Sequence, residues 1–354
     1  MNRIAGFDGI RAIAAVAVVF THTAAGFLQI GGFAVNVFFV LSGYLIIFNL
    51  HRSRRRVEER GSRPLAALAD FWRKRSRRIM PAYYVVLLLS LPVAIHLEGM
   101  TLSQVAFYAA YLQNFLMARA DDWLPLGHLW TLAVEQQFYL VIAPLLLFTP
   151  ARRHADLLIG TLVLMLGLIV WIYLFPIITP FQLDRMPFGA ILLGCAGGVM
   201  AIRPVVRVSG RAALAFFAVG TLTAMFPPWV FSGSALALIA VFVVQATACT
   251  VIVVWVARNQ SSRVVSLLEN RILVFFGVIS YSLYLVHGAV ATAFKHYWID
   301  VEFGLGSLDL ALNRLLLFPA ALAVSVAIAY PVWRLFEAPF QSRGAAVRPV
   351  RAQA

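Results

Sequence analysis

Three ionisable side chains lie inside apolar segments that are long enough to cross a membrane. They are His22, Glu135 and His287, and lipid penalises each of them unless a partner or a function explains it. Counting along ideal helices at about 1.5 Å per residue puts all three at a comparable depth, displaced towards the outer face. A neutral imidazole held by a carboxylate can take a proton from a hydroxyl near neutral pH. The three residues therefore predict one polar cavity for general acid–base chemistry, in which Glu135 orients His22.

The same cluster has three other interpretations. A metal site would need ligands at short helical spacing, and the sequence has no such pair; His128 would be the additional ligand. A proton relay would make the protein a proton-coupled transporter or flippase of a glycan or lipid-linked sugar, but the inverted repeats typical of transporters are missing. A structural role would leave His22 bonded to a neighbouring helix. We keep acid–base catalysis without a metal as the main hypothesis and the transporter as its alternative.

Arg11 and His22 share one face of the first predicted helix. The eleven residues from one to the other correspond to a rise of about 16 Å and a rotation of only about 20°. Arg75 and Arg78 stand three residues apart in RKRSRRIMPAYY, a spacing that lets two guanidinium groups clamp a phosphate at the cytoplasmic surface. Binding to anionic lipid is the simpler role for any one arginine. As a set, the three arginines favour a phosphate-bearing ligand that enters from the cytoplasm.

Other polar residues in the apolar segments are candidates for substrate binding. In GHLWTLAVEQQFYL, Trp130 stands where an outer aromatic belt is expected, so anchoring at the interface is its alternative role. Ser42 and Gly43 interrupt the apolar run VFFVLSGYLI, which is typical of close helix contact. Hydrogen bonds between helices are the alternative role for the polar side chains. The candidate substrate-binding residues are Asn36, Tyr44, His128, Trp130, Tyr281 and His287.

The composition requires membrane helices to position these residues. Of the 354 residues, 62% are hydrophobic and 12% are charged, whereas soluble domains are about half apolar and about a quarter charged. Apolar blocks of about 17 to 25 residues recur along the whole length and predict an all-α, polytopic membrane bundle. The segment 102–118 carries several amides and is expected to form a helix at the interface. About ten transmembrane helices are expected, near residues 10–29, 34–50, 79–97, 129–149, 156–176, 186–202, 212–227, 235–257, 274–296 and 310–333.

The charge distribution predicts the orientation of the bundle. The segment 51–78 holds eleven basic residues, and Lys and Arg collect in cytoplasmic loops, so ten spans place both termini in the cytoplasm. We expect one membrane domain at 1–340, with a basic cytoplasmic loop at 51–78, followed by a basic cytoplasmic tail at 341–354. These segments account for the net charge of +14, so no nucleic-acid partner is expected. Cys195 and Cys249, the only cysteines, fall inside spans, which disfavours a disulfide framework.

Six motifs, in order along the chain, resemble those of the acyltransferase-3 family of integral-membrane acyltransferases. They are FDGIRAIAAVAVVFTH, VFFVLSGYLI, RSRRIMPAYY, HLWTLAVEQQFYL, SYSLYLVHGAV and RLFEAPF. The resemblance implies transfer of an acyl group from acyl-CoA to carbohydrate hydroxyls of exported glycans, lipid-linked sugars, lipopolysaccharide or macrolides. It also implies that His22 is the catalytic histidine. By the same resemblance, Arg11, Arg75 and Arg78 serve the acyl-CoA side.

The residues and the resemblance together lead to one hypothesis. Acyl-CoA, with acetyl-CoA as the expected donor, docks from the cytoplasm with its phosphates on the three arginines, and no metal takes part. His22, oriented by Glu135, deprotonates a hydroxyl of a carbohydrate or glycolipid acceptor, which then attacks the thioester. Gln136 stands where the family often has a second acid, so Glu135 is expected to act alone. We expect a multi-pass protein of a bacterial inner membrane, in contact with membrane lipid.

Overall fold

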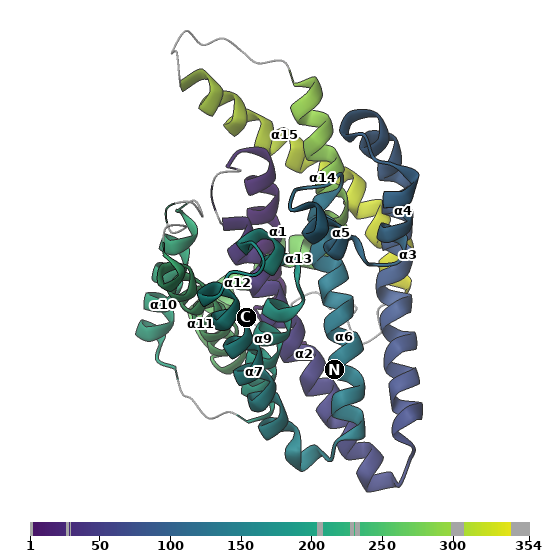
Figure 1. Ribbon diagram of the computed structural model, residues 1–354, viewed down its shortest axis with the longest axis vertical. Coiled ribbons are helices and arrows are strands. Elements are labelled where there is room, and N and C mark those ends of the chain that lie inside the picture. Colours follow the sequence, from purple (N-terminus) through teal and green to yellow (C-terminus); the bar gives the residue numbers. More distant parts are fainter. Residues whose placement is uncertain are drawn as a thin grey trace, which may run out of the picture.

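The computed structural model describes residues 3–25, 28, 30–203, 208–226, 230, 234–298 and 308–340. Within these residues all regular secondary structure is helical, which confirms the predicted fold class. In Figure 1, α2 (Ile30–Arg60), α3 (Pro64–Glu98) and α6 (Trp130–Phe148) run as long columns towards the lower end. The other α-helices are α1 (Phe7–Thr23), α4 (Leu102–Ala109), α5 (Gln113–Ala120), α7 (His154–Leu174), α8 (Pro180–Arg185), α9 (Phe188–Ile202), α10 (Gly210–Ala224), α11 (Ala235–Arg258), α12 (Arg263–Leu268), α13 (Arg271–Val278), α14 (Ser280–Tyr297) and α15 (Leu308–Val332).

Each of the ten predicted spans overlaps a helix, but the helices differ in their ability to cross a membrane. α1, α9 and α10 have 17, 15 and 15 residues, at or below the lower limit for a hydrocarbon core of about 30 Å. α13 and α14 are bent by 72° where they meet, so they form at most one broken span. By length and apolar composition, six described helices, or seven with the bent pair, are suited to crossing a membrane.

The predicted number of ten spans is therefore not confirmed. The multi-pass character agrees with the six long apolar helices, which are α2, α3, α6, α7, α11 and α15. The cytoplasmic location of both termini stays a prediction, and the predicted basic tail at 341–354 lies outside the described residues.

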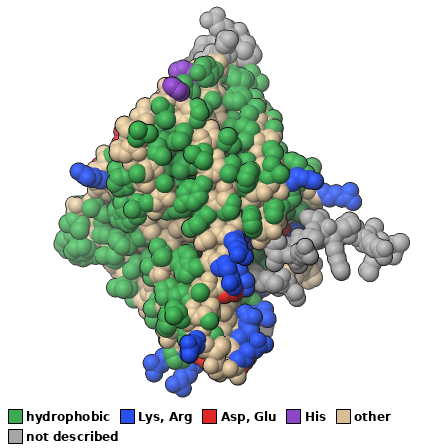
Figure 2. All heavy atoms as spheres, turned by 90° about the vertical axis from the view of Figure 1, so that its right-hand side faces the viewer, with side chains coloured by type: hydrophobic (Ala, Val, Ile, Leu, Met, Phe, Trp, Pro, Cys, Tyr) green, Lys and Arg blue, Asp and Glu red, His purple; other side chains and the backbone are tan. Residues whose placement is uncertain are grey.

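The segment 51–78, which is predicted to form a cytoplasmic loop, is helical over most of its length, and its location in the cytoplasm stays a prediction. α2 continues to Arg60 and α3 begins at Pro64, so only a short turn separates them. An ion pair at helical spacing stabilises the end of α2, where Arg54 lies 3.0 Å from Glu58. Figure 2 shows Lys and Arg side chains at this lower end and a largely hydrophobic surface above it. The basic segment is thus a helical hairpin that continues α2 and α3 beyond their apolar parts.

The single helix expected at 102–118 is instead two short helices. α4 and α5 lie near the upper end of α3 in Figure 1, and Tyr111 between them has a φ of 56°, which a regular right-handed helix does not allow. The amides of this segment turn into the protein, where Gln113 and Asn114 are completely buried. Asn114 donates a hydrogen bond to the carbonyl oxygen of Arg185 at 3.0 Å. This contact fixes α5 against the end of α8.

α2 packs very closely on α9 because two glycines face each other. A Cβ atom on Gly43 would lie 2.3 Å from the Cα atom of Gly194. The interpretation of the LSGYL stretch as a helix contact is therefore confirmed for Gly43. Its neighbour Ser42 instead forms a hydrogen bond with Glu135 of α6. On α2, Gly43 thus forms the contact with α9, and the adjacent Ser42 lies in the polar interior of the bundle.

Candidate active site

Two histidines, one from α1 and one from α14, form the centre of the site. Nδ1 of His22 lies 2.8 Å from Nε2 of His287, and the two rings stack with their centroids 5.0 Å apart. Nδ1 of His287 lies 2.7 Å from the carbonyl oxygen of Tyr284, in the preceding turn of α14. The His287 side chain is buried. The structure therefore brings together two of the three residues that were predicted to converge.

The carbonyl group of Tyr284 determines where the protons of the neutral rings lie. A carbonyl oxygen only accepts hydrogen bonds, so Nδ1 of His287 carries a proton and donates it to Tyr284. Nε2 of His287 then holds a lone pair, which accepts a hydrogen bond from Nδ1–H of His22. The remaining lone pair of the neutral His22 ring is on Nε2. This nitrogen is the one that can take a proton from a substrate.

A third imidazole packs against this pair. The ring centroid of His128 lies 4.6 Å from that of His287 and 6.3 Å from that of His22. Nε2 of His128 donates a hydrogen bond to the carbonyl oxygen of Leu285 at 3.1 Å. Gly288 makes room for this ring, because a Cβ atom there would lie 2.0 Å from Cε1 of His128. Gly288 was not among the predicted site residues, although it directly follows His287.

The hydrogen bonds of the histidine cluster leave few nitrogens for a metal ion. Nδ1 of His287 and Nε2 of His128 both donate to backbone carbonyls, whereas a metal needs a lone pair on the nitrogen. Throughout the described part of the chain, no group of three or more His, Cys, Asp or Glu side chains is arranged to hold a metal ion. The arrangement of the cluster suits proton transfer.

Glu135 lies in the same interior but does not hold His22. Its carboxylate accepts a hydrogen bond from Oγ of Ser42 at 2.7 Å and another from the hydroxyl of Tyr139, one turn along α6. The predicted contact between Glu135 and His22 is therefore wrong, and His287 takes that position. The depth of Glu135 along its helix was predictable, but the rotation of α6 about its axis turns the carboxylate towards α2. A catalytic role for Glu135 stays a prediction.

The three predicted arginines come together at one end of a row of polar side chains. The charge of Arg78 on α3 interacts with those of Arg75 and, from α1, Arg11. The guanidinium of Arg75 lies 5.0 Å from the ring centroid of Tyr139. Tyr139 is hydrogen-bonded to Glu135, so the row continues from the arginines into the bundle. This arrangement places concentrated positive charge at one end of the row and the carboxylate of Glu135 at the other, whereas the histidine pair belongs to a separate hydrogen-bonded set.

Glu337 was not among the predicted site residues, yet it is buried at the arginine end. Its carboxylate accepts a hydrogen bond from Oγ of Ser282 at 3.1 Å, and its charge attracts that of Arg78. Glu337 is the last residue of a π-helical turn, Trp333–Glu337, a distortion that is frequent at functional sites. The signal in the sequence was an acidic residue inside the closing motif RLFEAPF.

Two of the predicted substrate-binding residues have structural contacts. Tyr281 donates a hydrogen bond to the carbonyl oxygen of Ile79 at 2.9 Å and so joins α14 to α3. Tyr44 packs edge-on against Phe7, with ring centroids 5.6 Å apart. Neither contact lies in the histidine cluster. A direct role of Tyr281 or Tyr44 in substrate binding stays a prediction.

Asn36 and Trp130 have surroundings that are compatible with a ligand. Asn36 on α2 is partly buried, and its side chain forms no hydrogen bond with another described residue. Trp130 begins α6, two residues after His128, and its ring stacks on the guanidinium of Arg185 at 4.5 Å from the ring centroid. Arg185 was not among the predicted site residues, because nothing in its sequence surroundings marks it as buried.

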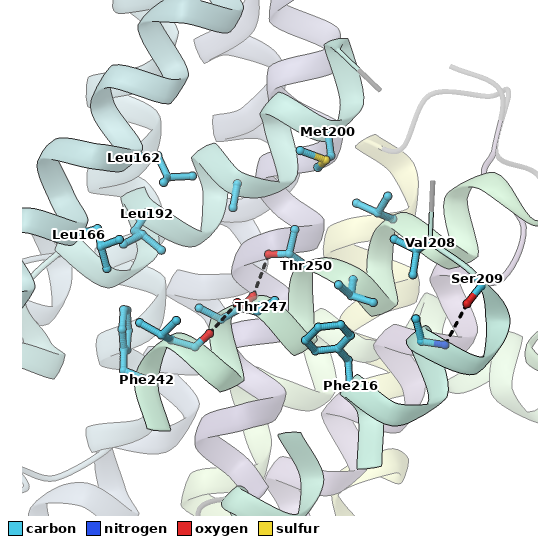
Figure 3. Close-up of a pocket in the computed structure, with 16 residues that line it drawn as sticks. Leu162, Leu166, Leu192, Met200, Val208, Ser209, Phe216, Phe242, Thr247 and Thr250 are labelled. Atoms are coloured by element: carbon cyan, nitrogen blue, oxygen red, sulfur yellow. Dashed lines mark hydrogen bonds between the residues drawn. The ribbon is translucent and has the colours of Figure 1, made fainter. Parts of the chain in front are cut away.

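A separate apolar cavity of about 640 Å³ lies among α7, α9, α10 and α11 (Figure 3). Leu162, Leu192 and Phe216 are among its lining residues, and none of the described lining side chains is ionisable. The hydroxyls of Thr247 and Thr250 donate to carbonyl oxygens of their own helix at 2.8 Å each. Because this cavity offers no acid–base group, the histidine cluster is the better candidate for the active site.

Comparisons with known proteins point to one class of enzyme. Residues 4–334 match the acyltransferase-3 family model, which describes an acyltransferase domain. A provisionally named O-acetyltransferase of Staphylococcus aureus (strain COL) is 26% identical over 385 aligned residues, which cover 97% of this chain and 58% of that protein. The O-acetyltransferase OatA of Staphylococcus aureus (strain NCTC 8325 / PS 47) is 27% identical over 333 residues, covering 83% of this chain and 52% of that protein. The chain thus spans a little over half the length of these relatives. No solved structure is significantly similar to it.

Proposed function

The chain belongs to the acyltransferase-3 family, and on this premise we propose that it transfers an acetyl group from acetyl-CoA to a carbohydrate hydroxyl. The observation that carries the proposal is the hydrogen-bonded pair of His22 and His287, with Arg11, one of three clustered arginines, on the same helix as His22. The pair supplies a base, and the arginines supply a site for phosphates. O-acetyltransferase activity in the named relatives supports acetyl as the transferred group and oxygen as its acceptor.

The arginine cluster suits the phosphate groups of CoA. A guanidinium offers planar, paired N–H donors that match phosphate oxygens, and Arg11, Arg75 and Arg78 together present three of them. Arg11 and His22 lie on one helix, at a separation of about 16 Å along its axis. An extended CoA arm that follows this helix would carry its thioester from the arginines towards the imidazole pair. In the predicted orientation the donor enters from the cytoplasm.

The histidine pair suits direct transfer to a hydroxyl. Nε2 of His22 takes the proton of the acceptor hydroxyl as its oxygen forms a bond to the thioester carbon. The tetrahedral intermediate then collapses with cleavage of the C–S bond, and the CoA sulfur takes the proton back from Nε2. Throughout, Nδ1–H of His22 donates to His287, which holds the ring in orientation and stabilises its cationic form. The acceptor would be a carbohydrate or glycolipid that reaches the pair from the outer side.

The alternative of a proton-coupled transporter finds less support. A relay requires groups that pass protons by hydrogen bonds from one end of the bundle to the other. In the described residues, Glu135 is bonded to Ser42 and Tyr139, while His22 is bonded to His287. The two groups therefore belong to separate hydrogen-bonded sets. We keep the acyltransferase as the proposed function.

One experiment tests both the acetylation of the polysaccharide and the role of His22 in it. Surface polysaccharide from a deletion strain is compared by mass spectrometry after complementation with the wild type, His22→Ala or His296→Ala. His296 is an exposed histidine on α14 and serves as the matched control. We expect the acetyl mass increment with the wild type and the control and its loss with His22→Ala at equal protein level. Undiminished acetylation by His22→Ala would refute the assignment of the base.

A further inference from the structure

Arg185, the last residue of α8, is enclosed by aromatic rings. Only 4% of its surface is exposed. Its guanidinium carbon lies 4.0 Å from the ring centroid of Phe181, 4.4 Å from that of Trp123 and 4.5 Å from that of Trp130. We call these four residues the Arg185 cage. Phe181 precedes Arg185 by one turn of α8, whereas Trp123 and Trp130 come from a distant part of the chain, so only the folded protein assembles the cage.

Arg185 forms no ion pair in the described residues, although its charge interacts with the neighbouring carboxyl group of Asp184. Its Nε atom is buried without a hydrogen-bond partner, and no described carboxylate lies within ion-pairing distance. Burial lowers the pKa of Arg185 to about 10, so the guanidinium is still charged at neutral pH. Contacts with aromatic rings offset part of the cost of burying an ion. Because its Nε–H group has no acceptor in the described residues, the guanidinium is suited to binding an anion.

The cage adjoins the histidine cluster. Trp130 follows His128 by two residues, and Arg185 interacts electrostatically with Tyr284. Tyr284 donates a hydrogen bond to the carbonyl oxygen of His128 at 2.9 Å, and its own carbonyl accepts the proton of His287. An anion held by Arg185 would therefore lie beside the imidazoles.

Hydrogen bonds hold the backbone of Arg185 on one side, and an exposed ring covers its side chain on the other. Its carbonyl oxygen accepts a hydrogen bond from the buried Asn114, and Asn114 is joined to Gln137 of α6 by a second hydrogen bond at 2.8 Å. Trp123, in contrast, is 53% exposed. The rings surround the guanidinium carbon, so the N–H donors that point away from them are the part left for a ligand.

We infer that the Arg185 cage binds a carboxylate or phosphate group of the acceptor and so selects acidic carbohydrates over neutral ones. The inference rests on the proposed function, because it names the class of acceptor. The bound anion would hold the sugar with one hydroxyl at Nε2 of His22. Two sources of the anion, a uronic acid and a sugar phosphate, share this chemistry, and the experiment distinguishes them.

The test measures binding and transfer separately with the full chain in lipid nanodiscs. The probes are a hexuronic acid trisaccharide, its carboxyl-methylated form and a neutral trisaccharide that carries one phosphate. Arg185→Gln removes the charge, and Arg185→Lys keeps a charge without the paired donors. Arg119→Gln is the matched control, because Arg119 is an exposed arginine at the end of α5. Each variant is first compared with the wild type in thermal unfolding.

We expect Arg185→Gln to raise the KM for the preferred anionic acceptor by about 10- to 100-fold, the range for a hydrogen-bonded charge pair. The KM for acetyl-CoA should not change, and Arg185→Lys should fall between Arg185→Gln and the wild type. Preference for the uronic acid or for the phosphate identifies the source of the anion. Equal affinity of the wild type for all three sugars would overturn the inference, as would an unchanged KM in a folded Arg185→Gln variant.

Binding to the His22→Ala protein separates this inference from the proposed function. That variant cannot transfer, so calorimetry reports acceptor binding alone. Anion binding that depends on Arg185, without any acetyl transfer by the wild type, would support the cage and refute the enzyme. Acetyl transfer at equal rates to acidic and neutral acceptors would support the enzyme and refute the cage.

Discussion

Nδ1 of His22 lies 2.8 Å from Nε2 of His287, and this single hydrogen bond connects the end of α1 with the middle of α14. His287 is held in turn by the carbonyl of Tyr284, so its ring cannot turn without losing that bond. The pair resembles the base and the orienting group of a hydrolase triad, with a neutral imidazole in place of a carboxylate. A neutral partner orients the base without adding a negative charge to the interior of the bundle.

His287 is a positioning residue, and its removal should lower kcat. Without it, Nδ1–H of His22 loses its acceptor and the ring is free to turn. We expect His287→Ala to reduce kcat by about 100-fold or more, the contribution of an effective general base, with the KM for acetyl-CoA unchanged. His287→Gln should recover part of the loss, because its amide oxygen can accept the same hydrogen bond. Wild-type kcat in His287→Ala, measured with radiolabelled acetyl-CoA in nanodiscs, would contradict this role.

The clustered arginines should determine the affinity for the donor. We expect Arg78→Gln to raise the KM for acetyl-CoA by about tenfold or more, because a charge-assisted contact to phosphate is lost. Arg77→Gln is the matched control, since Arg77 is exposed on the same helix. Initial rates are measured at low and high salt. If both variants raised the KM for acetyl-CoA equally, the overall positive charge of the basic hairpin would attract the donor, and a defined phosphate site would be contradicted.

Gly288 should not tolerate a side chain. A Cβ atom there would lie 2.0 Å from Cε1 of His128, so Gly288→Ala must displace that ring. Overpacking of this kind costs about 1–3 kcal/mol of stability, and the displaced ring would disturb the histidine pair. Gly160→Ala on α7 is the control, because nothing lies within 4 Å of its added Cβ. Thermal unfolding in detergent should show a lower Tm for Gly288→Ala alone; equal Tm values would contradict the predicted clash.

Glu135 should contribute less to kcat than His287. Ser42 and Tyr139 donate to one oxygen of its carboxylate, and the amide oxygen of Gln can accept the same hydrogen bonds, so Glu135→Gln removes the charge and leaves His22 in place. We expect a loss of about two- to tenfold in kcat, because hydrogen bonds to a neutral acceptor are weaker than those to a carboxylate. Tyr139→Phe should have a similar effect, because it removes one of these two hydrogen bonds. A loss of about 100-fold in the kcat of Glu135→Gln, equal to that of His287→Ala, would contradict this expectation and support the prediction that Glu135 orients His22.

Sequence reasoning located the helices well, because apolar length is a local property of the chain. It placed a helix at each of the ten apolar segments and put Arg11 and His22 on one of them. The prediction was less accurate where a segment is both rich in charge and suited to form a helix. The segment 51–78 is rich in charge and was expected to be a loop, but Arg and Glu at helical spacing continue α2 to Arg60.

The partners of the site residues depend on relations between helices, and only the tertiary structure decided them. The rise per residue gave the depth of His22, Glu135 and His287, because every turn of a helix has the same height. The rotation of each helix about its axis depends on its packing, as when Gly43 lets α2 approach α9 and Ser42 faces Glu135. The sequence by itself thus determined which chemical groups enter the bundle and how deep they lie. Packing decided that His22 meets His287 and that Arg185 lies among three rings, since those contacts join segments far apart in the chain.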